Sequence, residues 1–113
     1  AARKRKQAKA ARARLAAAQK LKGSGGANQF YGEIEKALLT FLEAKLGRTA
    51  HGLTRPQLAE AMTAAGVPAS AQAKVLAALE RTDAGRFAPG GGDARRTETL
   101  DHAAAAMEQW DER

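Results

Sequence analysis

The chain has 113 residues, a formal net charge of +7 at neutral pH, few aromatic residues and no cysteine. A chain of this length has room for one small domain, and the absence of cysteine excludes disulfides and thiolate metal sites. No apolar run approaches the ~20 residues that a membrane-spanning helix needs.

The excess of positive over negative charge is confined to the first 22 residues. Residues 23–113 hold 10 basic and 12 acidic side chains and are faintly acidic. Glycines and a serine over residues 23–27 predict a flexible hinge, so we expect a basic arm over residues 1–22 and a helical body over residues 28–113. The arm has no acidic residue and nine basic ones: Arg3, Lys4, Arg5, Lys6, Lys9, Arg12, Arg14, Lys20 and Lys22.

The basic arm has the composition of a helix but no evident core face. Alanine, lysine, arginine and glutamine favour helix, whereas Leu15 and Leu21 are its only large apolar residues. Like charges at helical spacing repel one another, so the arm is expected to be helical on a surface and frayed in free solution. Three interpretations are open: a segment beside a membrane, a nucleic-acid tail, or a solvated tail. The first fits best, because each Lys or Arg near anionic lipid contributes about 1 kcal/mol.

Two helices are predicted between the hinge and Gly66. Apolar residues recur at helical spacing from about Phe30 to Leu46, and Gly47 suits the left-handed residue that ends a helix. The second helix has a clear start, because Thr54-Arg55-Pro56-Gln57 places a capping threonine three residues before a glutamine, with proline in the first turn. Its buried stripe is expected to comprise Leu58, Ala61, Met62 and Ala65.

Two further helices complete the predicted bundle. Ser70 is expected to cap the third helix, and Pro89 is expected to exclude the segment Arg86–Pro89 from it. Asp93 could cap the fourth helix, over about residues 94–110, in which Trp110 buries the most apolar surface. The predicted fold class is all-α: a small four-helix bundle with a basic N-terminal helical arm. The inward face of the third helix is expected to comprise Ala71, Val75, Leu76, Leu79 and Thr82.

No pattern in the sequence predicts catalysis. The two histidines, His51 and His102, have no ligand-spaced partner; we expect His51 to be solvated in a loop and His102 to form a surface ion pair. The segment Gly90–Gly92 is not followed by Lys-Ser/Thr, so it is no phosphate-binding loop. We therefore expect no enzyme activity, no cofactor and no metal.

The alternative function is nucleic-acid binding by a small helix-turn-helix-like domain with a basic tail. Residues 54–65, 66–69 and 70–82 could form the two helices and the turn. The candidate recognition helix offers Gln72, Lys74 and Arg81 among alanines and Glu80. Without its arm, however, the acidic body would repel a polyanion, so nucleic acid is the less favoured partner.

Several runs of residues resemble the C-terminal cytoplasmic tail of BatD, the aerotolerance or oxygen tolerance family of bacterial membrane proteins. The resemblance covers about residues 1–92, and one departure is Thr82-Asp83-Ala84-Gly85, where the family commonly has a cysteine or another bulky residue. After the basic, alanine-rich arm, the resembling runs are Phe30-Tyr31-Gly32-Glu33-Ile34-Glu35-Lys36-Ala37-Leu38, Leu46-Gly47, Leu53-Thr54-Arg55, Ala65-Gly66-Val67, Val75-Leu76-Ala77-Ala78-Leu79 and Arg86-Phe87-Ala88-Pro89-Gly90.

The resemblance implies a large periplasmic part, a transmembrane helix upstream of Ala1, and this segment on the cytoplasmic face of the inner membrane. It also implies partners, namely the MoxR-type AAA+ ATPases and von Willebrand A-domain membrane proteins beside which BatD-like proteins are encoded. We therefore expect a non-enzymatic interaction module. Its candidate docking residues are Tyr31, Arg86, Phe87 and Pro89, with core packing as the alternative for Tyr31 and Phe87.

Overall fold

The computed structural model describes residues 13, 15–17, 20, 26–87 and 92–111 of the chain. Four helices follow one another through the body: α2 (Ala27–Leu46), α3 (Arg55–Ala64), α4 (Ala69–Phe87) and α5 (Gly92–Asp111). The described arm residues, including Leu15–Ala17, are helical as well, and the described residues contain no strand. The predicted fold class, an all-α small helical bundle, is confirmed.

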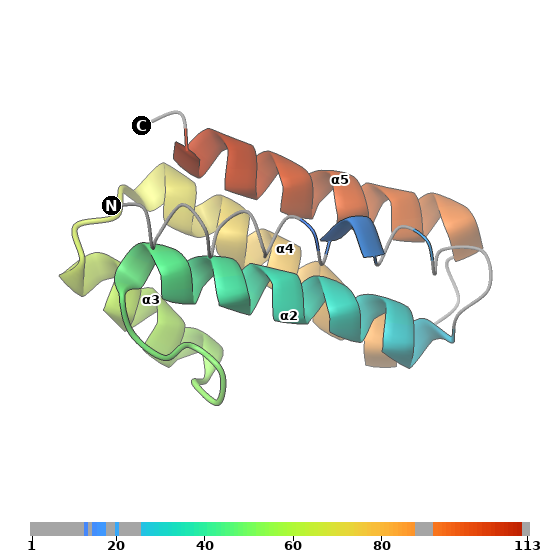
Figure 1. Ribbon diagram of the computed structural model, residues 1–113, viewed down its shortest axis with the longest axis horizontal. Helices are drawn as coiled ribbons and strands as arrows, with labels where there is room; N and C mark the ends of the chain where they lie inside the picture. Colours follow the sequence, from blue (N-terminus) through green and yellow to red (C-terminus); the bar gives the residue numbers. More distant parts are fainter. Residues whose placement is uncertain (1–12, 14, 18–19, 21–25, 88–91, 112–113) are drawn as a thin grey trace.

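The long helices α2, α4 and α5 lie side by side, and the shorter α3 covers one end of the bundle (Figure 1). Helix α4 is the centre of the arrangement, because it contacts each of the other three helices. The largest side chains that are fully buried come from all four helices and form one core: Phe30, Ile34, Leu38, Phe41, Leu42, Leu58, Met62, Val75, Leu79 and Met107.

Helix α2 supplies half of that core because its apolar residues recur every three or four positions. It ends as predicted at Gly47, whose φ of 69° is left-handed and whose N–H donates to the Glu43 carbonyl over 2.9 Å. The helix begins at Ala27, so the predicted boundary between hinge and body moves by one residue.

The predicted start of α3 is confirmed in detail. The Thr54 hydroxyl accepts a hydrogen bond from the Gln57 N–H (3.2 Å), and the Gln57 side-chain oxygen accepts one from the Thr54 N–H (2.9 Å). Leu58, Ala61 and Met62 are buried as predicted. The prediction for Ala65 is wrong: this residue is exposed, because the helix ends at Ala64 and Ala65 only caps it.

Helix α4 is longer than predicted and runs through Asp83-Ala84-Gly85 to Phe87. The exclusion of Arg86 and Phe87 from this helix was wrong, because a proline disfavours the helical conformation of the residue directly before it and not of residues further back. Helix α4 begins at Ala69, so Ser70 lies inside the helix and is not its cap. Thr82 is buried as predicted, and its hydroxyl donates to the Leu79 carbonyl over 2.6 Å.

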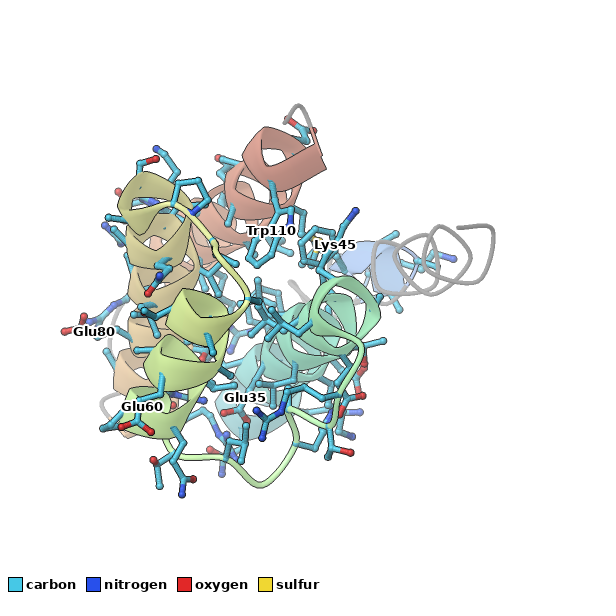
Figure 2. All side chains as sticks on the ribbon, turned by 90° about the vertical axis from the view of Figure 1, so that its left-hand side faces the viewer. Glu35, Lys45, Glu60, Glu80 and Trp110 are labelled. Carbon is cyan, nitrogen blue, oxygen red and sulfur yellow. The ribbon has the colours of Figure 1, made fainter. Side chains whose placement is uncertain are left out.

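Helix α5 begins at Gly92, one residue before the predicted cap Asp93, and packs along α4. Near its end Trp110 is partly buried, and its ring meets Phe41 of α2 edge-on with the centroids 5.8 Å apart. Figure 2 shows Trp110 beside Lys45, whose ammonium lies 5.4 Å from the centroid of the same Phe41 ring. Trp110 therefore faces inward, but only partly buried, whereas Met107 of the same helix is fully buried.

One close contact sets the distance between α2 and α4. The ring of Tyr31 lies directly on the backbone of Gly85, so that a Cβ added to Gly85 would be 2.5 Å from the ring atoms Cε1 and Cε2. Only glycine leaves this space open. The Tyr31 ring also meets Phe30 edge-on, with the centroids 5.0 Å apart.

We expect Gly85→Ala to lower the free energy of unfolding by about 1–3 kcal/mol, because the added methyl group forces the two helices apart. Gly32→Ala is the control. Gly32 also lies inside a helix, but a Cβ there meets no heavy atom within 4 Å, so we expect it to stabilise the protein by about 1 kcal/mol. Urea denaturation followed by circular dichroism measures both changes, and equal effects would contradict the packing of Tyr31 on Gly85.

The loop between α2 and α3 is held by the carboxylate of Glu43. Its Oε2 accepts hydrogen bonds from the backbone N–H of Ala50 (2.8 Å), the backbone N–H of His51 (3.2 Å) and the His51 Nδ1 (2.9 Å). Burial alone would raise the pKa of Glu43, but the hydrogen bonds from His51 and Ala50 outweigh it and hold this pKa below its ordinary value of 4.5. Ala50 is consequently buried against the core.

Because the pKa of Glu43 is lower in the folded chain than in the unfolded one, its contribution to stability is complete above the unfolded pKa. This contribution is lost as the pH falls through the folded pKa. We expect Glu43→Gln to cost about 1 kcal/mol at neutral pH and the difference from the parent protein to shrink below about pH 4. Urea denaturation across this pH range tests the expectation. Glu60→Gln, at an exposed position of α3, is the control and should change little; a Glu43→Gln difference independent of pH would contradict the role of the carboxylate.

Candidate functional site

Four charged side chains from three helices form a continuous chain of ion pairs. The Arg55 Nη2, at the start of α3, lies 2.8 Å from Asp83 Oδ1 of α4 and 2.6 Å from Glu35 Oε2 of α2. The other Glu35 oxygen, Oε1, accepts from Arg86 Nη1 over 2.7 Å. The Arg55 Nε also donates to Asp83 Oδ2 over 3.3 Å, so the Arg55–Asp83 pair is bidentate. Figure 2 shows Glu35 between α2 and α3.

This cluster of Arg55, Asp83, Glu35 and Arg86 is only partly shielded from water. The side chains of Arg55, Glu35 and Asp83 are between 21% and 36% exposed. Burial alone would lower the pKa of Arg55, but the hydrogen bonds to Asp83 and Glu35 outweigh it, so this pKa is raised and the guanidinium stays charged. The two cations and two anions balance, and the arrangement ties the start of α3 to both α2 and α4.

Of the predicted docking residues, the structure places Tyr31 in the core. Its side chain is only 3% exposed, and a buried ring has no surface to offer to a partner, so Tyr31 leaves the set of docking candidates. Arg86 is partly exposed but engaged by Glu35. Phe87 is the last residue of α4, and its side chain, like the whole of Pro89, lies outside the described residues.

The predicted membrane-facing arm is described at few positions. Of its nine basic residues only Lys20 is described, and it is exposed; Arg3, Lys4, Arg5, Lys6, Lys9, Arg12, Arg14 and Lys22 lie outside the described residues. Leu15 is 9% exposed and belongs to the core cluster. The prediction that the arm has no core face is therefore wrong at this residue. A single leucine among alanines gave too weak a periodic signal for its burial to be predicted.

The histidines behave as surface residues. His51 is exposed as predicted but also binds Glu43. His102 is exposed, and no described residue forms the expected ion pair with it. Among the described residues, no group of three or more metal-ligating side chains is placed to hold an ion. In the same part of the chain, no helix combines the length and the apolar character that crossing a bilayer requires.

Two grooves on the surface were not predicted. One lies between α3 and α4, has a volume of about 340 Å³, and is lined by Arg55, Pro56, Ala59, Leu76, Glu80 and Asp83. The second lies between α4 and α5, has a volume of about 420 Å³, and is lined by Ser70, Ala73, Lys74, Ala77, His102, Ala105 and Ala106. Both grooves combine residues of two helices, and no local pattern in the sequence reports on such combinations.

The side chain of Gln72, which the helix-turn-helix alternative needs for reading bases, is instead hydrogen-bonded in the turn between α3 and α4. The Gln72 amide nitrogen donates to the Val67 carbonyl (3.0 Å) and to the Thr63 hydroxyl (3.2 Å). Arg81 faces Glu98 of α5 at 3.9 Å. Among the described residues, Lys74 is the one of these three candidates that is exposed and has no such contact. Few exposed cations among alanines favour a structural role for the α3–α4 pair.

Comparisons with protein-family models, with curated proteins and with solved structures found no match to this chain. The likeness to the BatD tail therefore rests on the runs of residues quoted above.

We expect Arg55→Met to destabilise the protein by about 1–2 kcal/mol, because Asp83 and Glu35 then face each other without the shared cation. Arg81→Met is the matched control. Arg81 is 3.9 Å from a carboxylate that is 65% exposed, so its loss should change the stability by less than about 0.5 kcal/mol. Urea denaturation at low and high salt measures both, and the effect of Arg55→Met should be smaller at high salt. Equal losses from the two substitutions would argue against the cluster.

Proposed function

We propose that this chain is a non-enzymatic docking module on the cytoplasmic face of the bacterial inner membrane, part of a BatD-like aerotolerance protein. One observation carries the proposal: three runs that resemble the BatD tail, far apart in the sequence, lie against one another in the fold. Glu35 lies in the run Phe30–Leu38. It binds Arg55 of the run Leu53–Arg55 and Arg86 of the run Arg86–Gly90. Contacts of this kind among the resembling residues are what a shared fold requires.

The module works by binding. Its partners under this proposal are a MoxR-type AAA+ ATPase and von Willebrand A-domain membrane proteins, which the resemblance to BatD implies. The basic arm lies against anionic lipid headgroups, where its Lys and Arg side chains gain favourable electrostatic energy. The helical body is presented to the cytoplasm, and an upstream transmembrane helix connects it to a periplasmic part.

The partner assignment is tested with purified proteins. The 113-residue chain is immobilised, and a MoxR-type ATPase and von Willebrand A-domain proteins from its source organism are passed over it, with and without ATP. We expect saturable binding of at least one of them. An AAA+ ATPase of the same organism that is not of the MoxR type serves as the control. If it binds as well as the proposed partners, or if none of them binds, the proposed partners are wrong.

The role of the arm is tested by flotation with lipid vesicles. The full chain should bind vesicles rich in phosphatidylglycerol and not vesicles of phosphatidylcholine. Replacing the first five basic residues with glutamine should weaken the binding by more than about a hundredfold, because each contributes about 1 kcal/mol. Binding that survives this replacement would show that the arm is not the lipid contact. Circular dichroism of the variant confirms that the body still folds.

A further inference from the structure

The groove between α3 and α4 has the chemistry of a docking surface. Its apolar lining comes from Pro56 and Ala59 of α3 and from Leu76 of α4. Leu76 is only partly buried although it packs against the core, so part of its apolar surface is open at the floor of the groove. The volume of about 340 Å³ is enough for one or two aliphatic side chains of a partner.

The rim of this groove is acidic. Glu80 lines the groove, and so does Ala59 of α3. Glu60, the next residue after Ala59, is exposed. Neither glutamate has an ion-pair partner among the described residues. Figure 2 shows both side chains pointing outward on the same side of the molecule.

Arg55, the one cation among the described residues that line the groove, does not offset these acids. Arg55 is already engaged by Asp83 and by Glu35, at 2.8 Å and 2.6 Å, and Glu35 is further balanced by Arg86. The cluster is therefore neutral as a whole, and the two glutamates leave the groove with excess negative charge. A partner that complements this surface carries positive charge on both sides of an apolar side chain.

The length of the groove indicates the shape of that partner. Leu76, Glu80 and Asp83 line it from α4, and this spacing extends over about 10 Å of helix. A partner helix of two to three turns covers the same distance, with leucine-like side chains on one face and Lys or Arg beside them.

We propose that the α3–α4 groove binds a basic amphipathic helix of a partner protein. An aliphatic side chain of that helix fills the floor at Ala59 and Leu76, and its Lys or Arg side chains pair with Glu60 and Glu80. This inference rests on the proposed function in one respect, since it names the face through which the docking module binds. The alanine-lined groove between α4 and α5 offers Lys74 and His102 instead, and it serves as the control surface.

The probe is a synthetic peptide of roughly 12 residues, with leucines at helical spacing and lysines elsewhere. It is titrated into the ¹⁵N-labelled 113-residue chain at physiological salt. We expect saturable chemical-shift changes at residues of α3 and α4 that line the groove, and no binding of the same peptide with every lysine replaced by glutamate. Changes centred on the α4–α5 groove or around Leu15, or changes that do not saturate, would overturn the proposal.

Two pairs of variants sharpen the test. Glu60→Lys/Glu80→Lys should weaken the binding at least about tenfold. Asp101→Lys/Glu108→Lys, an equal change in charge at exposed positions of α5, should leave it within about twofold.

Ala59→Gln fills the groove without a change of charge and should weaken binding about tenfold, whereas Ala77→Gln in the neighbouring groove should not. If either control weakens binding as much as its counterpart, the groove is not the site. Circular dichroism confirms that each variant folds.

A second readout separates this inference from the proposed function. The same variants are tested for binding to the MoxR-type ATPase and the A-domain proteins. If Ala59→Gln leaves partner binding intact, the groove is not the docking face, but the docking function stands. If the peptide binds and none of the partners does, the groove stands and the assigned partners are wrong.

Sedimentation of the chain alone completes the test. A dimer that Glu60→Lys/Glu80→Lys dissociates would identify the occupant as the basic arm of a second copy and overturn the partner helix.

Discussion

The close approach of α2 to α4 at Tyr31 and Gly85 is the constraint on which the arrangement of the other parts depends. Because the Tyr31 ring rests on the backbone of α4, Glu35, one helical turn further along α2, comes within reach of Arg86 on α4. The same carboxylate then meets Arg55 at the start of α3. Helix α3 is held to the core by Leu58 and Met62, and the shared charge fixes its first turn against α2 and α4.

The local features of this fold were predictable from sequence, and its pairings were not. Each local feature depends on residues only three or four positions apart, which is the range over which a helix repeats. Examples are the capping box at Thr54, the left-handed Gly47 and the apolar stripe of α2. The ion pairs of the cluster join residues 20, 28 and 51 positions apart, and a single sequence contains no signal for them. Tyr31 was ambiguous for a related reason, since only the glycine at position 85 decides that its ring is buried.

Although arm and body differ in charge, Leu15 of the arm packs into the core of the body. The arm holds the excess positive charge of the chain, yet this one leucine is buried in the core of a body that is faintly acidic. A burial of this size contributes on the order of 1–2 kcal/mol, which is small beside the attraction of nine cations to anionic lipid. If the arm binds anionic lipid as proposed, the burial of Leu15 is therefore the weaker of the two contacts that position the arm.

The described part of the arm lies where lipid contact, as proposed, would leave the α3–α4 groove free. The described arm residues lie on the side of the molecule away from Glu60 and Glu80 (Figure 2), with α2 between them. A body that is attached to a negatively charged surface through its arm would therefore turn the acidic α3–α4 groove toward the solvent, where lipid headgroups cannot compete for it. Repulsion between the acidic rim and an anionic bilayer disfavours the opposite orientation. If the arm contacts lipid as proposed, Glu60 and Glu80, on the other side of α2 from the described arm residues, therefore favour this orientation before any partner has bound.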